Sequence, residues 1–369
     1  MVTGITYRFS FFSLILPVAI LLSFGLLMIF ETTSAEIIDR SLGIDTRSAL
    51  WKQLFYCVIG LGLGAVAYRI GFEQWIASGR ILLWGATFLL VLLFIPGIGQ
   101  SIHGAKRWIS LMGWSFQPSE WVKLCIPFAY IQWMKKREEP FLKMLGRLAL
   151  PIALILLEPD NGTAAILLFL LSVLFLLSSI PFSYWALPLI CLIAVAATVA
   201  WQMPHARKRI EIYLHPERDL LGKGHQPYQA KIAAGSGGLW GKGLGESLQK
   251  LSYLPEARND YIAAIFAEEV GFVGVTALIL IYMLFTYGGL TVAYRTKHLE
   301  GKTLAASLTS LIAIQAFLNL GVVSGLLPSK GMTLPFFSQG GTSLIVNLVI
   351  LFLLLDISRK SLSANKERE

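Results

Sequence analysis

Apolar segments of about twenty residues recur along nearly the whole chain, which is the length that a transmembrane helix requires. Hydrophobic residues make up 55% of the sequence and charged residues only 14%, whereas soluble domains carry about 25% charged residues. Within lipid the backbone must satisfy its own hydrogen bonds, and no segments alternate with period two as barrel strands do. We therefore predict an all-α polytopic membrane protein.

We predict ten membrane-spanning helices in a single domain that covers residues 1–369. The fifth is short, because the sequence Glu158-Pro-Asp-Asn-Gly162 interrupts the apolar run before the sixth begins. Such breaks are tolerated at membrane depth where protein or a water-filled cavity covers the freed backbone. The predicted spans are 9–30, 50–68, 81–95, 118–134, 148–157, 163–180, 184–203, 261–287, 303–325 and 341–356.

Lysine and arginine in the short loops predict the orientation of these helices. They concentrate in one set of loops, above all 135–147, and in the C-terminal segment 357–369. We therefore expect both termini and the tail 357–369 to be cytoplasmic. The long hydrophilic loop 204–260 then lies outside the membrane, because long loops translocate largely regardless of charge.

Composition argues against several other classes of protein. The net charge of +9 is explained by basic loops of a membrane protein, so we predict no nucleic-acid partner. Cys57, Cys125 and Cys191 lie inside apolar runs and suggest packing rather than disulfides or metal binding. The histidines of the long loop lack the spacing of metal ligands.

The long loop contains the glycine-rich run GSGGLWGKGLG at 235–245, which is too rich in glycine for a regular helix. It lacks the spacing of a nucleotide-binding P-loop. Two interpretations remain open: a cradle for some other pyrophosphate, or a flexible structural turn.

Asp260 stands where the long loop ends and the eighth predicted span begins. It can cap the helix N-terminus, or act as a general base at the mouth of a cavity. Glu268 and Glu269 lie deeper, about 12 Å into the span at roughly 1.5 Å per residue. Because adjacent helical residues point about 100° apart, we expect the two glutamates to have different partners and a structural role.

Acidic and basic side chains gather on the predicted outer side of the membrane against an apolar wall. Glu120 and Lys123 are i,i+3 neighbours, so a local ion pair is the alternative to a functional role. A mixed-charge surface of this kind suits a substrate with an anionic head and a long lipid tail. The group comprises Lys106, Arg107, Glu120, Lys123, Asp160, Glu256, Asp260 and Lys330.

Six motifs in sequence order resemble the SEDS family (shape, elongation, division and sporulation), membrane peptidoglycan glycosyltransferases that include RodA and FtsW. They are HGAKRWI at 103–109, FQPSEWVK at 116–123, EPDNGTA at 158–164, KIAAGSGGLWGKGLG at 231–245, LPEARNDYIAAIFAEEVG at 254–271 and LPSKGMTLPFFSQGGTS at 327–343. The segments GLGESLQKLSYLPEA and SKGMTLP are more similar to FtsW than to RodA. Two positions depart from the family pattern: Arg258-Asn259 replaces His-Thr, and SQGGTS replaces Ser-Tyr-Gly-Gly-Ser-Ser.

The resemblance implies polymerisation of lipid II into β-1,4 glycan strands, with inversion, on the outer face of the bacterial cytoplasmic membrane. Asp260 matches the family's essential aspartate and would accept the hydroxyl proton. Lys106, Arg107 and Lys330 would neutralise the pyrophosphate. A divalent ion such as Mg²⁺ or Mn²⁺ could share that task, although no ligand cluster indicates one. The remaining residues expected to bind substrate are Glu120, Lys123, Asp160, Glu256 and Ser338.

The family also implies protein partners, namely a class B penicillin-binding protein that crosslinks the strands and other membrane proteins of the division or elongation machinery. Two rival functions stay open. A lipid II transporter would suit ten spans with a broken helix and intramembrane acids. A non-catalytic scaffold that activates a transpeptidase would not need Asp260.

Overall fold

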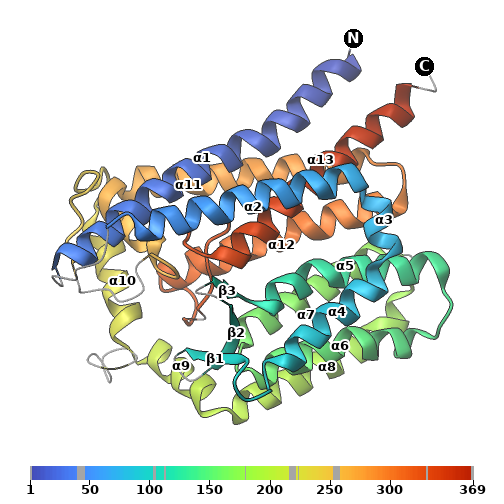
Figure 1. The fold of residues 1–369 in the computed structure, drawn as a ribbon, viewed down its shortest axis with the longest axis horizontal. Helices are drawn as coiled ribbons and strands as arrows, with labels where there is room; N and C mark the ends of the chain where they lie inside the picture. The colour runs from blue at the N-terminus through green and yellow to red at the C-terminus, as the bar shows by residue number, and fades with distance from the viewer. Residues whose placement is uncertain are drawn as a thin grey trace.

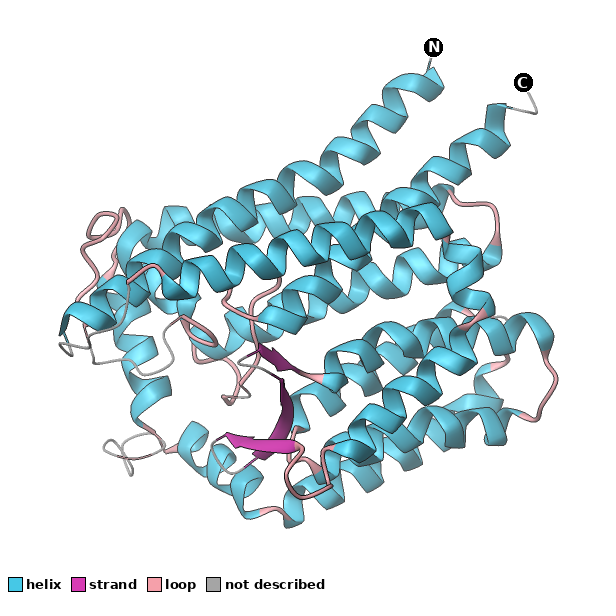
Figure 2. Ribbon diagram, viewed as in Figure 1, coloured by secondary structure: helices cyan, strands magenta, loops and turns pink. Residues whose placement is uncertain are grey.

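The computed structural model describes residues 2–39, 46–102, 105–111, 114–178, 180–215, 222, 224–251, 258–329 and 331–366. The described part is largely helical (Figure 2). Its helices are α1 Val2–Asp39, α2 Ser48–Ile70, α3 Phe72–Ala77, α4 Gly79–Leu92, α5 Pro118–Lys136, α6 Phe141–Leu157, α7 Asn161–Leu177, α8 Phe182–Gln202, α9 Pro204–Leu214, α10 His225–Ser236, α11 Ile262–Arg295, α12 Leu299–Val323 and α13 Gly341–Lys366.

The long helices form two groups that run roughly side by side (Figure 1). In the first group α13 packs against α2, and α11 packs against α1 and α12. In the second, α4 packs against α5, and α6 packs against α7 and α8. Helix α12 joins the groups through contacts with α5 and α7. Both termini lie at one end of the bundle, and α9, α10 and a small sheet lie toward the other (Figure 1). We call the latter the loop end.

Each of the ten predicted spans coincides with one helix. Six of the described helices are long and apolar enough to cross a membrane: α1, α2, α8, α11, α12 and α13. Helices α4 and α7 are apolar but shorter. Helix α6 begins at Phe141, earlier than predicted, because Arg147 pairs with Glu139 and so is tolerated within the helix. A polytopic helical architecture is confirmed, whereas the number ten remains a prediction.

A three-stranded antiparallel sheet at the loop end corrects the all-α expectation. The strands are β1 Gly99–Ile102, β2 Ala105–Leu111 and β3 Trp114–Phe116, in the order β1-β2-β3. The pairs Gln100↔Trp108 and Ser110↔Ser115 set the register. Strands β1 and β3 are too short to predict, the sequence AKRWISL of β2 does not alternate, and pairing with neighbours stabilises all three. The sheet connects α4 to α5 and positions Arg107.

Helix α11 is broken at Gly271, whereas the sequence predicted an uninterrupted span. Gly271 has φ +67° and ψ −166°, which is not helical and favours glycine. The backbone freed by the break pairs with the loop that follows α10: Lys242 N donates to Glu268 O at 3.0 Å, and Phe272 N donates to Gly238 O at 2.9 Å. We call residues 237–251 the plug loop, because its backbone fills the break.

The plug loop explains the glycine-rich run. A Cβ atom at Gly241 would overlap the backbone of Glu269, and one at Gly271 would overlap the nitrogen of Gly241. Only glycine allows backbones to approach this closely. Gly237 and Gly241 of the run thus serve close backbone packing against α11, and a role of the run as a pyrophosphate cradle remains a prediction.

Glu268 and Glu269 are fully buried and have separate partners, as predicted. Glu268 accepts hydrogen bonds from Lys242 Nζ at 2.6 Å and Ser247 Oγ at 2.5 Å, both in the plug loop. Glu269 pairs with Lys250 Nζ at 2.9 Å. Buried carboxylates need such partners, so these acids fix the plug loop to α11.

Candidate active site

Arg107 of β2 reaches the turn between α6 and α7. Its Nε donates to Glu158 O at 3.3 Å, its Nη2 donates to Pro159 O, and its Nη1 lies 3.9 Å from Asp160 Oδ1. The guanidinium thus satisfies carbonyl groups that the end of α6 leaves without a helical partner. The sequence analysis placed Arg107 and Asp160 in the same group of charged residues, and in the structure the two side chains lie close together.

Asp160 is the N-cap of α7. Its Oδ1 accepts the Thr163 backbone N–H at 3.2 Å, and its Oδ2 accepts the Thr163 hydroxyl at 2.9 Å. Beside it, Glu158 is 2% exposed, and neither carboxyl oxygen has a hydrogen-bond partner in the described part of the chain. The pKa of Glu158 is raised to about 8, chiefly by burial and also by the charge of Asp160, while Arg107 acts to lower it. Glu158 is therefore mostly protonated at neutral pH.

Asp260 lies in the turn before α11, on the far side of the same end of the bundle. Its carbonyl accepts Asn319 Nδ2 of α12 at 3.0 Å, and that amide also donates to Met332 O at 2.6 Å. A Cβ atom at Gly331 would lie 3.4 Å from Asp260 Oδ2, so the carboxylate faces the backbone of the segment before α13. The N-cap of α11 is Tyr261 rather than Asp260.

Arg209 of α9 links these two clusters electrostatically, and sequence reasoning missed it. Burial lowers the pKa of Arg209, and the nearby Arg107 lowers it further, whereas Asp160, Tyr261 and Asp260 raise it. Arg209 therefore interacts electrostatically with Arg107 and with each of the two aspartates. It is one of several basic residues in α9, and nothing in the sequence distinguishes it from its basic neighbours there.

Glu120 and Lys123 form the local ion pair that their spacing allows. Lys123 Nζ lies 2.8 Å from Glu120 Oε1 and donates to Gln315 Oε1 of α12 at 3.4 Å. All three side chains are buried between α5 and α12. Gln315 and Asn319 are i,i+4 neighbours on α12, so one helix face contacts both this pair and the Asp260 turn. The side-chain amides of Gln315 and Asn319 stand out in an otherwise apolar segment, and this feature of the sequence could have identified the functional face of α12.

Ser338 closes the turn that precedes α13. Its Oγ accepts the Leu334 N–H at 2.9 Å, and its carbonyl accepts Gln53 Nε2 of α2 at 3.3 Å. The next residue, Gln339, donates its N–H to Arg258 O at 3.0 Å. These bonds hold the segment before α13 against the Asp260 turn. The predicted contact of Ser338 with substrate remains a prediction.

Known proteins match this chain over nearly its full length. A sequence model of the FtsW, RodA and SpoVE family, described as "Cell cycle protein", matches residues 12–363. The chain belongs to this family. The relative "Probable peptidoglycan glycosyltransferase FtsW" of Thioalkalivibrio sulfidiphilus is 38% identical over 365 residues, which cover 96% of this chain and 91% of the relative. A protein of the same name from Geobacter sulfurreducens is 35% identical over 96% of both chains.

Solved structures of the family have the same fold. A chain from "Structural coordination of polymerization and crosslinking by a peptidoglycan synthase complex" matches with a TM-score of 0.74 and 26% identity, covering 94% of this chain and 97% of that one. The rod shape determining protein RodA of Thermus thermophilus matches with a TM-score of 0.68 and 25% identity, covering 95% and 96%. The resemblance drawn from the motifs is confirmed, and the relatives' names agree with the predicted enzyme class and FtsW branch.

Three predicted site residues of this family member lack described side chains. Glu256 and Lys330 lie outside the described residues, and of Lys106 only the backbone in β2 is described. Within the described residues, no three His, Cys, Asp or Glu side chains are grouped so as to hold a metal ion. We therefore assign no step of the reaction to a divalent ion.

Proposed function

We propose that the protein polymerises lipid II into peptidoglycan strands for septal wall synthesis, at the outer face of the cytoplasmic membrane. The family and the names of its relatives support this class of reaction. The observation that carries the assignment is the position of Asp260, a carboxylate at the loop end within electrostatic reach of Arg209. This arrangement offers a base and cationic groups for an anionic leaving group in one place.

The proposed reaction is a single displacement. The 4-hydroxyl oxygen of one disaccharide attacks the anomeric carbon of the lipid-linked glycan, and the bond from that carbon to the pyrophosphate oxygen breaks. Asp260 accepts the hydroxyl proton, and the lipid pyrophosphate leaves with the bonding electrons. Attack opposite the leaving group inverts an α-linked pyrophosphate to a β-1,4 glycosidic bond.

Positive charge near Asp260 serves two purposes in this proposal. Arg209 favours the ionised carboxylate, which is the form that accepts a proton. Arg107 and Arg209, together with Lys106 and Lys330, stabilise the negative charge that develops on the pyrophosphate. The residues proposed to shape the cavity around the substrate are Asp160, Glu120, Lys123, Glu256 and Ser338.

The remaining features of the proposal concern the cell. The chain spans the membrane ten times, with both termini and residues 357–369 in the cytoplasm and the loop 204–260 outside. A class B penicillin-binding protein is the proposed partner. In support of this, one structural neighbour belongs to a peptidoglycan synthase complex that coordinates polymerization and crosslinking. Other membrane proteins of the division machinery complete the assembly.

Replacing Asp260 with asparagine tests the proposal. Asp260→Asn keeps the shape of the side chain but removes the base, so polymerisation of lipid II by the purified protein should fall roughly 100-fold or more. Glycan products are resolved on gels, and thermal unfolding confirms that the variant folds. Glu246→Gln is the matched control, because it neutralises an exposed carboxylate at the same end of the bundle.

Full polymerisation by a well-folded Asp260→Asn protein would refute the assignment of the base. Lipid II transfer across proteoliposomes without polymer would favour the transporter instead. Normal wall synthesis in cells that carry only Asp260→Asn would favour the scaffold.

A further inference from the structure

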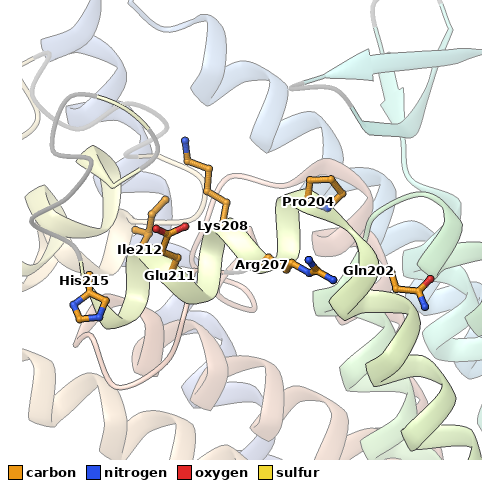
Figure 3. Close-up of a pocket in the computed structure, with 7 residues that line it drawn as sticks. All are labelled: Gln202, Pro204, Arg207, Lys208, Glu211, Ile212 and His215. Atoms are coloured by element: carbon orange, nitrogen blue, oxygen red, sulfur yellow. The ribbon is translucent and has the colours of Figure 1, made fainter.

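The structure has a polar groove along α9 whose lining does not include Arg209. It is a groove of about 570 Å³ at the corner between α8 and α9, lined by Gln202, Pro204, Arg207, Lys208, Glu211, Ile212 and His215 (Figure 3). Arg209 and Tyr213 line a different, smaller hollow with Lys231 and Ser329. The proposed catalytic groups therefore do not account for the groove.

The groove lies at the end of a helix whose surface is suited to lipid. Helix α8 is a candidate membrane span, and its exposed side chains include Leu187, Ile190 and Val195. It ends at Gln202, next to Trp201, which is 55% exposed. Tryptophan is enriched where helices leave the hydrocarbon core, so this corner lies at the level of lipid headgroups.

Helix α9 combines basic and apolar side chains as interfacial helices do. Arg207 and Lys208 are exposed, and so are the apolar side chains Ile210 and Leu214. Basic helices with exposed apolar residues lie in the headgroup region and are attracted to anionic lipids. Arg207 is held in place, since its Nε donates to Trp201 O at 2.5 Å and its guanidinium lies 5.6 Å from the centre of the Trp201 ring.

The charged side chains that line the groove indicate which kind of lipid headgroup it binds. Arg207 and Lys208 exceed the single acid Glu211, so the groove favours an anion such as a phosphate diester. Figure 3 shows Glu211 on the turn after Arg207, where its carboxylate can accept hydrogen bonds from hydroxyl groups. We propose that this groove binds the headgroup of phosphatidylglycerol, with Arg207 and Lys208 supplying the positive charge that attracts the phosphate and Glu211 accepting hydrogen bonds from the glycerol hydroxyls.

Native mass spectrometry of the full-length protein with defined lipids tests the site. Phosphatidylglycerol should be retained in preference to phosphatidylethanolamine. The double variant Arg207→Ala/Lys208→Ala should retain it on the order of tenfold less, because each basic residue near an anionic lipid contributes appreciably to binding. Arg207→Lys/Lys208→Arg keeps both charges and should restore retention. Lys52→Ala, which removes an exposed lysine from α2 at the same end, should change nothing.

Other outcomes would overturn the proposal. Equal retention by Arg207→Ala/Lys208→Ala and the unchanged protein would show that the groove is not the lipid site. A preference for phosphatidylethanolamine that is lost in Glu211→Gln would indicate that the groove binds an ammonium-bearing headgroup instead. Displacement of phosphatidylglycerol by a prenyl pyrophosphate, one for one, would assign the groove to the lipid-linked substrate instead.

Discussion

The two helix breaks at the loop end, one between α6 and α7 and one within α11, are stabilised in different ways. At the first, a single side chain, Arg107, binds the exposed carbonyls and Asp160 caps the next helix. At the second, the plug loop pairs its backbone with both sides of Gly271, and the buried Glu268 and Glu269 anchor it.

This difference indicates that the break between α6 and α7 can contribute to the active site, whereas the break at Gly271 stabilises the fold. Arg107 and Asp160 bring charge to the first break, and both interact electrostatically with Arg209. The second break is filled by backbone, and its acids are matched by lysines of the plug loop. Charged residues in membrane segments are therefore not all functional: Glu268 and Glu269 are paired with lysines of the plug loop and hold the structure together.

The largest expected loss of stability from a single substitution at the breaks comes from adding a side chain at Gly271. Gly271→Ala places a Cβ against the Gly241 nitrogen and forces alanine to a positive φ. Together the overlap and the backbone conformation should cost about 3 kcal/mol of unfolding free energy. Denaturation of the purified protein in detergent measures this loss.

Gly238→Ala is the matched control, since Gly238 also has a positive φ but open space around its Cβ position. It should cost only about 1 kcal/mol. Equal losses at the two positions would show that the plug loop does not pack tightly against the break.

The first break should be sensitive to the shape of the cation rather than to its charge alone. Arg107→Lys keeps the charge but loses the fork that binds two carbonyls and approaches Asp160. We expect a loss of about 2 kcal/mol in unfolding free energy and a clear drop in polymerisation. Arg80→Lys alters an exposed pair with Glu138 and should change stability by less than about 0.5 kcal/mol. Full activity and stability of Arg107→Lys would contradict this role.

The last expected effect, a slope of unfolding free energy with pH, distinguishes the protonated acid of the first break from the paired acids of the second. The pKa of Glu158 is raised from 4.5 to about 8. Between these values the folded protein binds a proton that the unfolded chain has lost, so unfolding free energy falls as pH rises, by up to about 1.4 kcal/mol per pH unit. Thermal unfolding of Glu158→Gln from pH 5 to 9 should lose this slope, and Glu246→Gln should keep it. An unchanged slope in Glu158→Gln would show that Glu158 is ionised.

The sequence predicted those features that depend on neighbours along the chain. The Glu120–Lys123 pair followed from i,i+3 spacing, the end of α6 from Glu158-Pro-Asp-Asn-Gly162, and the separate partners of Glu268 and Glu269 from helical geometry. The roles of Arg209, Gln315 and Asn319 were missed because they depend on segments distant in sequence. The sheet at β1–β3 was missed because β1 and β3 are short and the seven residues of β2 do not alternate between apolar and polar.

What the sequence determined by itself was the class of the protein, because apolar runs of membrane length allow little besides helices in lipid. Its motifs also determined the family. Only the tertiary structure decided which charges lie together. Burial and pairing depend on how helices distant in sequence pack, so packing alone distinguished the acids that anchor the plug loop from Asp260 and Asp160, which both interact with Arg209.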